Sequence, residues 1–398
     1  MALVNVIGLG YIGLPTALML ASHGVRVVGT DYNASLVETL NQGKTTFSEE
    51  GLDELFAKAV DAGIRFTTEY KSTDVYIVSV PTPYDEKSKK IDPCYVIAAV
   101  KKILTICPDG AVIVVESTVS PGTMDRFIRP LCEGRDVELV HAPERIIPGN
   151  MLFELEHNSR TIGADSPAVG ERIREIYSSF CKGEIVVTDI KTAEMTKVIE
   201  NTFRAVNIAF ANELAKLCYS ENMDVEEIRR ICNMHPRVNI LAPGPGVGGH
   251  CIPVDPWFLV GDYPQLTPLI AKAMEINEQM PDFIYDRICR LMEDNGITDF
   301  SRVGLYGLTY KEDVDDVRES PTLQLLHRHP KPFAVFDPMV NKPILDGQYR
   351  DFASFLEKVE LVVLMVGHSH IRRNEKVLEG KSVFDTRNIL KNIPTYRL

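Results

Sequence analysis

The chain has 398 residues, a length that suits two or three domains rather than one. Its formal net charge is −12 and no basic run offsets it, which argues against a nucleic-acid partner. Eight cysteines lie scattered without a C-x-x-C pair, which predicts reduced thiols in a cytoplasmic protein. No run of ~18 apolar residues occurs, so no membrane span is expected.

The first half of the chain alternates short apolar segments with helical ones. The segment 14–23 is rich in small residues and predicts a helix directly after the first apolar stretch. Strands alternating with helices are typical of a doubly wound parallel sheet. The expected strands are 3–8, 25–30, 75–80, 111–116 and 137–141.

The middle of the chain predicts helices. A long one is expected from Thr192 to Glu221, a second over 224–234, and another from Pro268 to about residue 295. The proline- and glycine-rich segment 242–256 between them cannot form a regular element.

Strand-helix alternation returns after Ser301, with apolar segments at 302–307, 333–336 and 361–366. The pattern therefore predicts two Rossmann-like α/β domains, each with a doubly wound parallel sheet, joined by a long central helix. The expected domains are 1–190, 191–298 and 299–398.

A dinucleotide site is predicted where Gly8, Gly10 and Gly13 form G-x-G-x-x-G between a strand and a helix. Asp31, eighteen residues after Gly13, ends the second strand, where a carboxylate favours the ribose of NAD over the phosphate of NADP. A glycine turn without cofactor, with Asp31 as a helix cap, is the alternative. The strand ends near Thr82 and Thr118 should line the same crevice. The expected NAD contacts are Gly8, Gly10, Tyr11, Ile12, Gly13, Asp31, Pro81, Thr82 and Thr118.

Reactive residues are predicted in two places. Cys251 lies on a glycine-rich loop, which is a poor core and a good platform for an exposed thiol, and Asp255 follows four residues later. Glu194, Lys197 and Asn201 share one face of the long helix. The alternatives are that Cys251 only fills an apolar core and that the polar residues of the helix face solvent. The histidines show no metal-ligand pattern, so no metal is predicted.

These pieces together resemble the UDP-glucose/GDP-mannose dehydrogenase family over nearly the whole chain. The motifs occur in the order and spacing of the family. They are GLGYIGLP at 8–15, VPTP at 80–83, EST at 116–118, PER at 143–145, EMTKVIEN at 194–201, GGHC at 248–251, VDP at 254–256 and YKEDVDDVRES at 310–320.

The resemblance implies an NAD-binding first domain, a central dimerisation and active-site region, and a third domain that binds the UDP-sugar. It makes Cys251 the nucleophile, with Lys197 and Asn201 at the oxyanion, and it gives Asp255 the hydrolytic water. Glu144 and Thr118 support proton transfer, and Lys311 and Arg318 hold the nucleotide diphosphate or complete the cofactor site. The implied substrate contacts are Glu144, Arg145, Lys197, Asn201, Arg204, Arg237, Asn239, Gly248, His250, Tyr310 and Lys311.

The reaction implied is a four-electron, NAD-dependent oxidation of a sugar C6 alcohol to a carboxylate. The loops at 200–214 and 235–258 are most similar to members that act on UDP-N-acetyl-D-mannosamine for cell-surface polysaccharides, with UDP-N-acetyl-D-glucosamine as the alternative. The second glutamate of glucose-type members is missing after Glu144, and Val254 replaces their lysine, so a UDP-N-acetylhexosamine is expected. Arg145 could then contact the N-acetyl group.

Two other classes are weighed against this reaction. A two-electron hydroxy-acid dehydrogenase would not need the GGHC loop, and a silent NAD-sensing module would not need Lys197, Cys251 and Asp255 together. The apolar long helix predicts a homodimer or larger assembly through residues 200–220, with Arg237 reaching the site of a neighbouring subunit as in relatives.

Overall fold

The N-terminal sheet positions the first glycine turn, which follows its strand β1. The computed structural model describes residues 3–147 and 149–398, and the first sheet has the spatial order β3-β2-β1-β4-β5-β6-β7-β8. Its first six strands follow the 3-2-1-4-5-6 order of dinucleotide-binding folds, and β7 pairs antiparallel to β6. The strands are β1 (Leu3–Ile7), β2 (Arg26–Thr30), β3 (Arg65–Thr67), β4 (Val75–Val78), β5 (Ala111–Val115), β6 (Val137–His141), β7 (Arg160–Ala164) and β8 (Ile185–Thr188).

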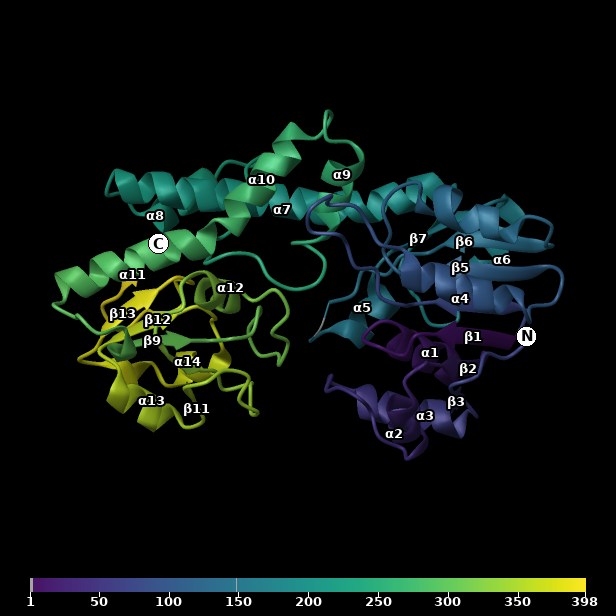
Figure 1. Ribbon diagram of the computed structural model, residues 1–398, viewed down its shortest axis with the longest axis horizontal. Coiled ribbons are helices and arrows are strands. Elements are labelled where there is room, and N and C mark those ends of the chain that lie inside the picture. Colours follow the sequence, from purple (N-terminus) through teal and green to yellow (C-terminus); the bar gives the residue numbers. More distant parts are fainter. Residues whose placement is uncertain (1–2, 148) are drawn as a thin grey trace. The chain divides into compact units, whose positions relative to one another are not determined.

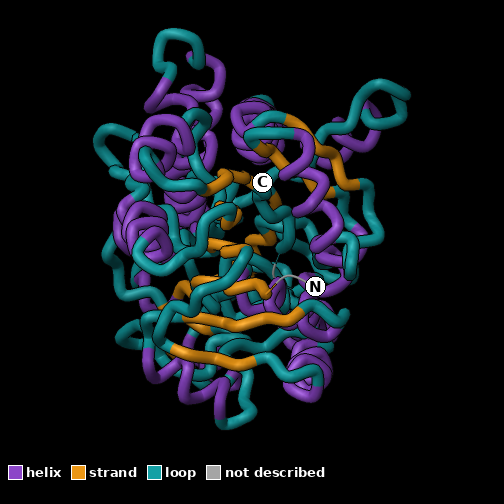
Figure 2. Tube along the Cα trace, turned by 90° about the vertical axis from the view of Figure 1, so that its right-hand side faces the viewer, coloured by secondary structure: helices purple, strands orange, loops and turns teal. Residues whose placement is uncertain are grey.

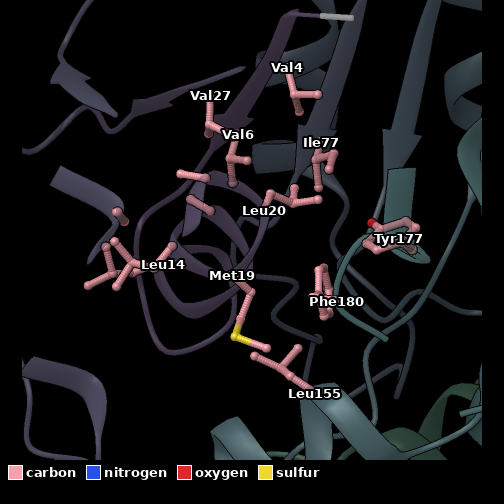
Figure 3. Packing of buried hydrophobic residues seen from close by; sticks show 14 of the residues in the cluster. Val4, Val6, Leu14, Met19, Leu20, Val27, Ile77, Leu155, Tyr177 and Phe180 are labelled. Atoms are coloured by element: carbon pink, nitrogen blue, oxygen red, sulfur yellow. The ribbon is translucent and has the colours of Figure 1, made fainter. Parts of the chain in front are cut away.

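The central strands are apolar throughout because helices cover both faces of this sheet (Figure 2). On one face, Leu20 of α1 lies beside Val6 of β1 and Ile77 of β4, and Met19 of α1 points toward Leu155, as Figure 3 shows from close by. The surrounding helices are α1 (Gly13–Ser22), α2 (Ala34–Asn41), α3 (Leu52–Asp61), α4 (Cys94–Leu104), α5 (Met151–His157) and α6 (Pro167–Tyr177), with short turns η1 (Met124–Ile128) and η2 (Arg129–Cys132).

A single helix of 31 residues, α7 (Ile190–Ser220), runs through the middle of the chain (Figure 1). The chain divides into two compact units, Met1–Glu200 and Asn201–Leu398, so the boundary falls inside this helix. Asp224 begins the next helix by accepting hydrogen bonds from the N–H groups of Glu226 and Glu227. The following helices are α8 (Val225–Cys232), α9 (Asp255–Asp262), α10 (Pro268–Glu278) and α11 (Met280–Asp294).

The second sheet repeats the strand order of the first. Its six strands are all parallel, in the order β11-β10-β9-β12-β13-β14, which is again 3-2-1-4-5-6 within the unit. The strands are β9 (Val303–Tyr306), β10 (Ala334–Phe336), β11 (Gln348–Tyr349), β12 (Leu361–Leu364), β13 (Ser382–Asp385) and β14 (Tyr396–Arg397). The other elements are η3 (Phe300–Arg302), α12 (Pro321–Arg328), α13 (Phe352–Lys358), α14 (Ser369–Arg373) and η4 (Glu375–Leu378).

The expected fold class is confirmed: two Rossmann-like sheets are joined by a long central helix. Two details of the central region differ from the sequence prediction. The helix expected over 268–295 is two helices, because α10 ends before Gln279 and Pro281 lies in the first turn of α11. The irregular loop is shorter than expected, because α9 already begins at Asp255. No helix in the described part of the chain is long and apolar enough to cross a membrane.

Candidate functional site: a glycine turn and a cysteine loop

The glycine turn after β1 has the geometry that a dinucleotide requires. Gly8 has a φ of +89°, and a Cβ there would lie 2.5 Å from the Ser79 carbonyl oxygen. A Cβ on Gly13 would come within 1.9 Å of the Gly8 carbonyl oxygen. No heavy atom lies within 4 Å of the corresponding position at Gly10, which is exposed, so the backbone there is open to a pyrophosphate. The turn therefore fits the cofactor that the sequence predicts.

Asp31 braces this turn from the end of β2. One carboxylate oxygen accepts the Leu9 N–H at 2.8 Å and the other accepts the Asn33 N–H at 2.9 Å. Each oxygen keeps acceptor capacity for a ribose hydroxyl. Of the neighbouring positions, Tyr11 stacks on Phe47 with ring centroids 4.5 Å apart. Ile12 and Thr118 are half-buried, Thr82 is buried and Pro81 is exposed.

The loop after β6 places Glu144 and Arg145 in the same unit as the glycine turn. Glu144 is buried, accepts the Arg145 N–H at 2.7 Å and forms an ion pair with Arg160. The Arg145 guanidinium donates to the Ser159 carbonyl oxygen at 2.8 Å and pairs with Glu200 at 2.7 Å. Arg145 is thus held by protein groups, while Glu144 belongs to a buried charge cluster.

The polar stripe of α7 is buried along its length. Glu194 has no exposed surface and accepts N–H groups from Gly122 at 2.6 Å and Met124 at 2.8 Å. Burial raises its pKa to about 7 despite these bonds. Lys197 is 7% exposed, so most of its side chain lies within the protein although it carries a charge. A largely buried lysine on this face of α7 is a candidate functional group.

In the second unit, the cysteine loop leads directly into α9. Cys251 is exposed, and its carbonyl oxygen accepts the Asp255 N–H at 2.8 Å. Asp255 is buried, and its carboxylate accepts the Asn201 side-chain amide at 2.6 Å. A backbone bond therefore ties Asp255 to the thiol-bearing turn, and a side-chain bond ties its carboxylate to Asn201 of α7.

Two motifs far apart in the sequence lie against each other in this unit. A Cβ on Gly248 would come within 2.6 Å of the Glu319 carbonyl oxygen and of the Tyr310 side chain, and Gly249 lies on the Tyr310 ring. The Gly249 N–H also donates to the Arg318 carbonyl oxygen at 3.0 Å. Only glycine fits there, so the GGHC loop is seated on the segment 310–320.

The remaining expected site residues lie at the surface. Lys311 is half-buried, and Arg318 is exposed and pairs with Asp316 at 2.6 Å. Four of these residues are exposed, namely Arg204, Arg237, Asn239 and His250. In the described residues, no group of three or more His, Cys, Asp or Glu side chains is placed to hold a metal ion.

The second sheet carries a turn built like the first one. Gly307 has a φ of +101° after β9, and the Leu308 N–H donates to Asp337 at the end of β10 at 2.5 Å. Here the acid has no exposed surface, because it also accepts the Thr309 N–H at 3.0 Å and lies 3.3 Å from His368 Nε2. This second turn was not anticipated from the sequence, since it lacks the full glycine motif.

A buried polar cluster in the first unit was also not predicted from the sequence. Arg160, in β7, contacts both Glu116 and Glu144, and the Tyr177 hydroxyl donates to Glu116 at 3.1 Å. An arginine that begins an apolar strand segment was the available signal, because a buried guanidinium requires acidic partners.

Comparison with known proteins matches three consecutive family models to the chain. Residues 2–181 match the NAD-binding domain of the UDP-glucose/GDP-mannose dehydrogenase family, 191–279 its central domain and 304–392 its UDP-binding domain. The first match confirms the expectation that the cofactor is NAD.

Individual relatives cover almost the full length. The UDP-N-acetyl-D-mannosamine dehydrogenase of Methanococcus aeolicus is 39% identical, over 98% of this chain and 92% of the relative. The NDP-N-acetyl-D-galactosaminuronic acid dehydrogenase of Ralstonia nicotianae is 38% identical, over 97% and 96%. The solved structure of UDP-D-ManNAc dehydrogenase from Pyrococcus horikoshii superposes with a TM-score of 0.91 at 34% identity, covering 99% of this chain and 98% of that one.

Proposed function

This chain belongs to the UDP-glucose/GDP-mannose dehydrogenase family, and we propose that it oxidises the C6 alcohol of UDP-N-acetyl-D-mannosamine to UDP-N-acetyl-D-mannosaminuronate through Cys251. It is an NAD-dependent nucleotide-sugar dehydrogenase, and the proposal concerns its sugar and its residues. The observation that carries the proposal is the pairing of an exposed thiol with a buried acid: Cys251 lies on the turn that Asp255 closes, and Asn201 holds Asp255.

The chemistry requires two successive oxidations and one hydrolysis. NAD held by the glycine turn and Asp31 would supply the hydride acceptor for each oxidation, two per sugar. The Cys251 thiolate adds to the aldehyde carbon formed first and retains it as a thiohemiacetal, which the second oxidation converts into a thioester. Water then cleaves the thioester, releasing the carboxylate and restoring the thiol.

Each remaining step is assigned to a residue whose surroundings suit it. Lys197, whose side chain is largely buried, stabilises the oxyanion, since an ammonium nearby offsets the negative charge that develops there. Asp255, oriented by Asn201, accepts a proton from the hydrolytic water. Glu144 and Thr118 support proton transfer from the first unit. Asp31 and the glycine turn hold the adenosine half of NAD.

Further assignments concern the UDP moiety, the other substrate contacts and the domain limits. We assign the UDP moiety to the third domain, 299–398, with Lys311 and Arg318 at the diphosphate. The other assigned substrate contacts are Arg145, Arg204, Arg237, Asn239, Gly248, His250 and Tyr310. The domain limits proposed are 1–190, 191–298 and 299–398.

The preference for an N-acetyl sugar is supported by sequence and relatives. The second glutamate of glucose-type members is missing after Glu144, and a relative named UDP-N-acetyl-D-mannosamine dehydrogenase is 39% identical over 98% of this chain. UDP-N-acetyl-D-glucosamine remains the second candidate, because the epimer depends on few contacts. The uronate would serve as a precursor of cell-surface polysaccharide, made in the cytoplasm.

A homodimer through α7 is supported by an exposed apolar row. Phe203, Phe210 and Leu217 follow each other at intervals of seven residues and are 68%, 58% and 55% exposed. Residues seven apart lie on one helix face, and a row of large apolar side chains there is typical of a helix-packing interface.

The test is the stoichiometry of NADH. Purified protein is mixed with NAD and, in parallel, with the UDP-activated N-acetyl-mannosamine, N-acetyl-glucosamine, N-acetyl-galactosamine and glucose. Two NADH per sugar with the mannosamine substrate alone is the expected result. Cys251→Ser should lower acid production by at least ~10³-fold while NAD binding survives. One NADH per sugar, or an active serine variant, would refute the role given to Cys251.

A further inference from the structure

A single buried cation in the first unit connects two acidic residues. The Arg160 side chain is 4% exposed, and its Nη1 lies 3.2 Å from Glu116 Oε1 while its Nη2 pairs with Glu144 Oε2. The guanidinium also lies over the ring of Tyr177, 4.0 Å from the centroid. Tyr177 and Phe180 form one wall of the apolar core beside it (Figure 3). The core therefore encloses a charged bridge whose two ends lead to different parts of the unit.

One end of the bridge lies beneath the glycine turn. Glu116 accepts the Ser79 hydroxyl at 2.6 Å, and Ser79 is the residue against which the turn is packed. A Cβ on Gly8 would lie 2.5 Å from the Ser79 carbonyl oxygen, and one on Gly13 would lie 3.0 Å from the Ser79 Cβ. Glu116 is thus tied to the floor of the NAD turn.

The other end of the bridge is Glu144, in a loop without regular secondary structure. Both of its carboxylate oxygens are fixed, one by the Arg145 N–H at 2.7 Å and one by Arg160. Because no helix or strand positions Glu144, these two bonds determine where its carboxylate points.

The charges explain why the bridge needs arginine. Two carboxyl groups share one guanidinium away from water. Burial raises the pKa of Glu116, and repulsion from Glu144 raises it further. The attraction of Arg160 and the hydroxyls of Ser79 and Tyr177 act in the opposite direction. A rigid guanidinium fork can donate to two acids in a fixed geometry, whereas an ammonium is a single flexible charge. A buried cluster of this kind contributes little to the stability of the fold, so we attribute to it the role of fixing where the carboxylates lie.

We propose that Arg160 is a positioning residue for the dehydrogenase reaction, which sets the Glu144 carboxylate at a fixed place relative to the NAD turn by bridging Glu144 to Glu116. This rests on the proposed function, in which Glu144 supports proton transfer. Arg160 acts through Glu144 in this proposal, because its guanidinium is enclosed with the two acids and Tyr177.

The test compares Arg160→Lys with a matched control. Arg129 also bridges two acids of the same unit, Asp125 at 2.9 Å and Asp165 at 2.7 Å, but it lies at the surface. Arg160→Lys should lower kcat by about 100-fold, the effect typical of a misplacement of ~1 Å, with KM for the sugar and Kd for NAD changed by less than about twofold. Arg129→Lys should leave kcat unchanged.

A second-site variant separates positioning from folding. In Arg160→Lys the two acids compete for one ammonium, so adding Glu116→Gln, which resembles protonated Glu116, should release it to Glu144 and recover kcat about tenfold or more. If Arg160 only stabilises the fold, the double variant will lose further activity, and kcat per folded molecule will be normal in the single one. Either result would overturn the proposal.

A stability cycle makes the proposal independent of turnover. The coupling free energy of unfolding between Glu116→Gln and Glu144→Gln should change clearly in an Arg160→Met background, because only the direct repulsion between the two acids then remains. An equal coupling free energy in both backgrounds would refute the bridge. A wild-type protein that reduces no NAD with any UDP-sugar would instead refute the proposed function, while the cycle still decides whether Arg160 couples the two acids.

Discussion

The protonation of Glu194 should control the stability of the first unit near neutral pH. Its carboxylate is fully buried, and burial raises its pKa from 4.5 to about 7. Because the folded state binds the proton more tightly than the unfolded state, the stabilisation is complete below about pH 4.5. It declines as the pH rises and is lost above about pH 7. The two pKa values differ by roughly 2.5, which corresponds to about 3 kcal/mol.

The assay is urea unfolding between pH 5 and 8.5, comparing wild type with Glu194→Gln, which cannot titrate. Stability of the wild type relative to the variant should fall across this range by up to about 3 kcal/mol. Asp189→Asn is the matched control, since Asp189 also accepts a backbone N–H, at 2.9 Å from Thr192, but hydrogen bonding lowers its pKa. Its difference from wild type should stay constant above pH 5. Parallel wild-type and Glu194→Gln curves would refute the reasoning.

Three other predictions follow from single contacts. Asp31→Asn should raise the Kd of NAD about tenfold by calorimetry, because a neutral amide accepts ribose hydroxyls less strongly; an unchanged Kd would remove Asp31 from the cofactor site. Asn201→Leu should release Asp255, slow thioester hydrolysis about 100-fold and reveal a burst of NADH in stopped flow. A uniform slowing without a burst would contradict the role of Asp255 in activating the hydrolytic water. Phe203→Asp with Phe210→Asp should halve the mass measured by light scattering, and an unchanged mass would place the interface elsewhere.

The order of elements was predictable because strong periodic patterns dominate the chain. The buried strands β1, β4, β5 and β12 and the long helix α7 all appear within a few residues of their expected limits. The strands β3, β7, β8, β11, β13 and β14 were not predicted, and β3, β11 and β14 have only two or three residues, which carry no periodicity of their own. Their place is set by pairing with a neighbouring strand, which is a tertiary effect.

For the site, sequence reasoning could bring residues together only where they lie close along the chain. Asp255 lies four residues from Cys251, and its N–H donates to the Cys251 carbonyl oxygen in the turn that leads into α9. Arg160 was missed because its partners Glu144 and Glu116 are 16 and 44 residues away, across three strands of the sheet. No spacing rule in one sequence brings those residues together.

The two glycine turns show why an acid after the second strand is not by itself a ribose site. In both sheets this acid accepts the backbone N–H of the residue after the turn glycine, from Leu9 to Asp31 and from Leu308 to Asp337. Its first role is therefore to brace the turn. A ribose can use only lone pairs that remain reachable, and those of Asp337 are enclosed by Thr309 and His368. In the domain that matches the UDP-binding model, the carboxylate equivalent to Asp31 is therefore committed to bracing the turn.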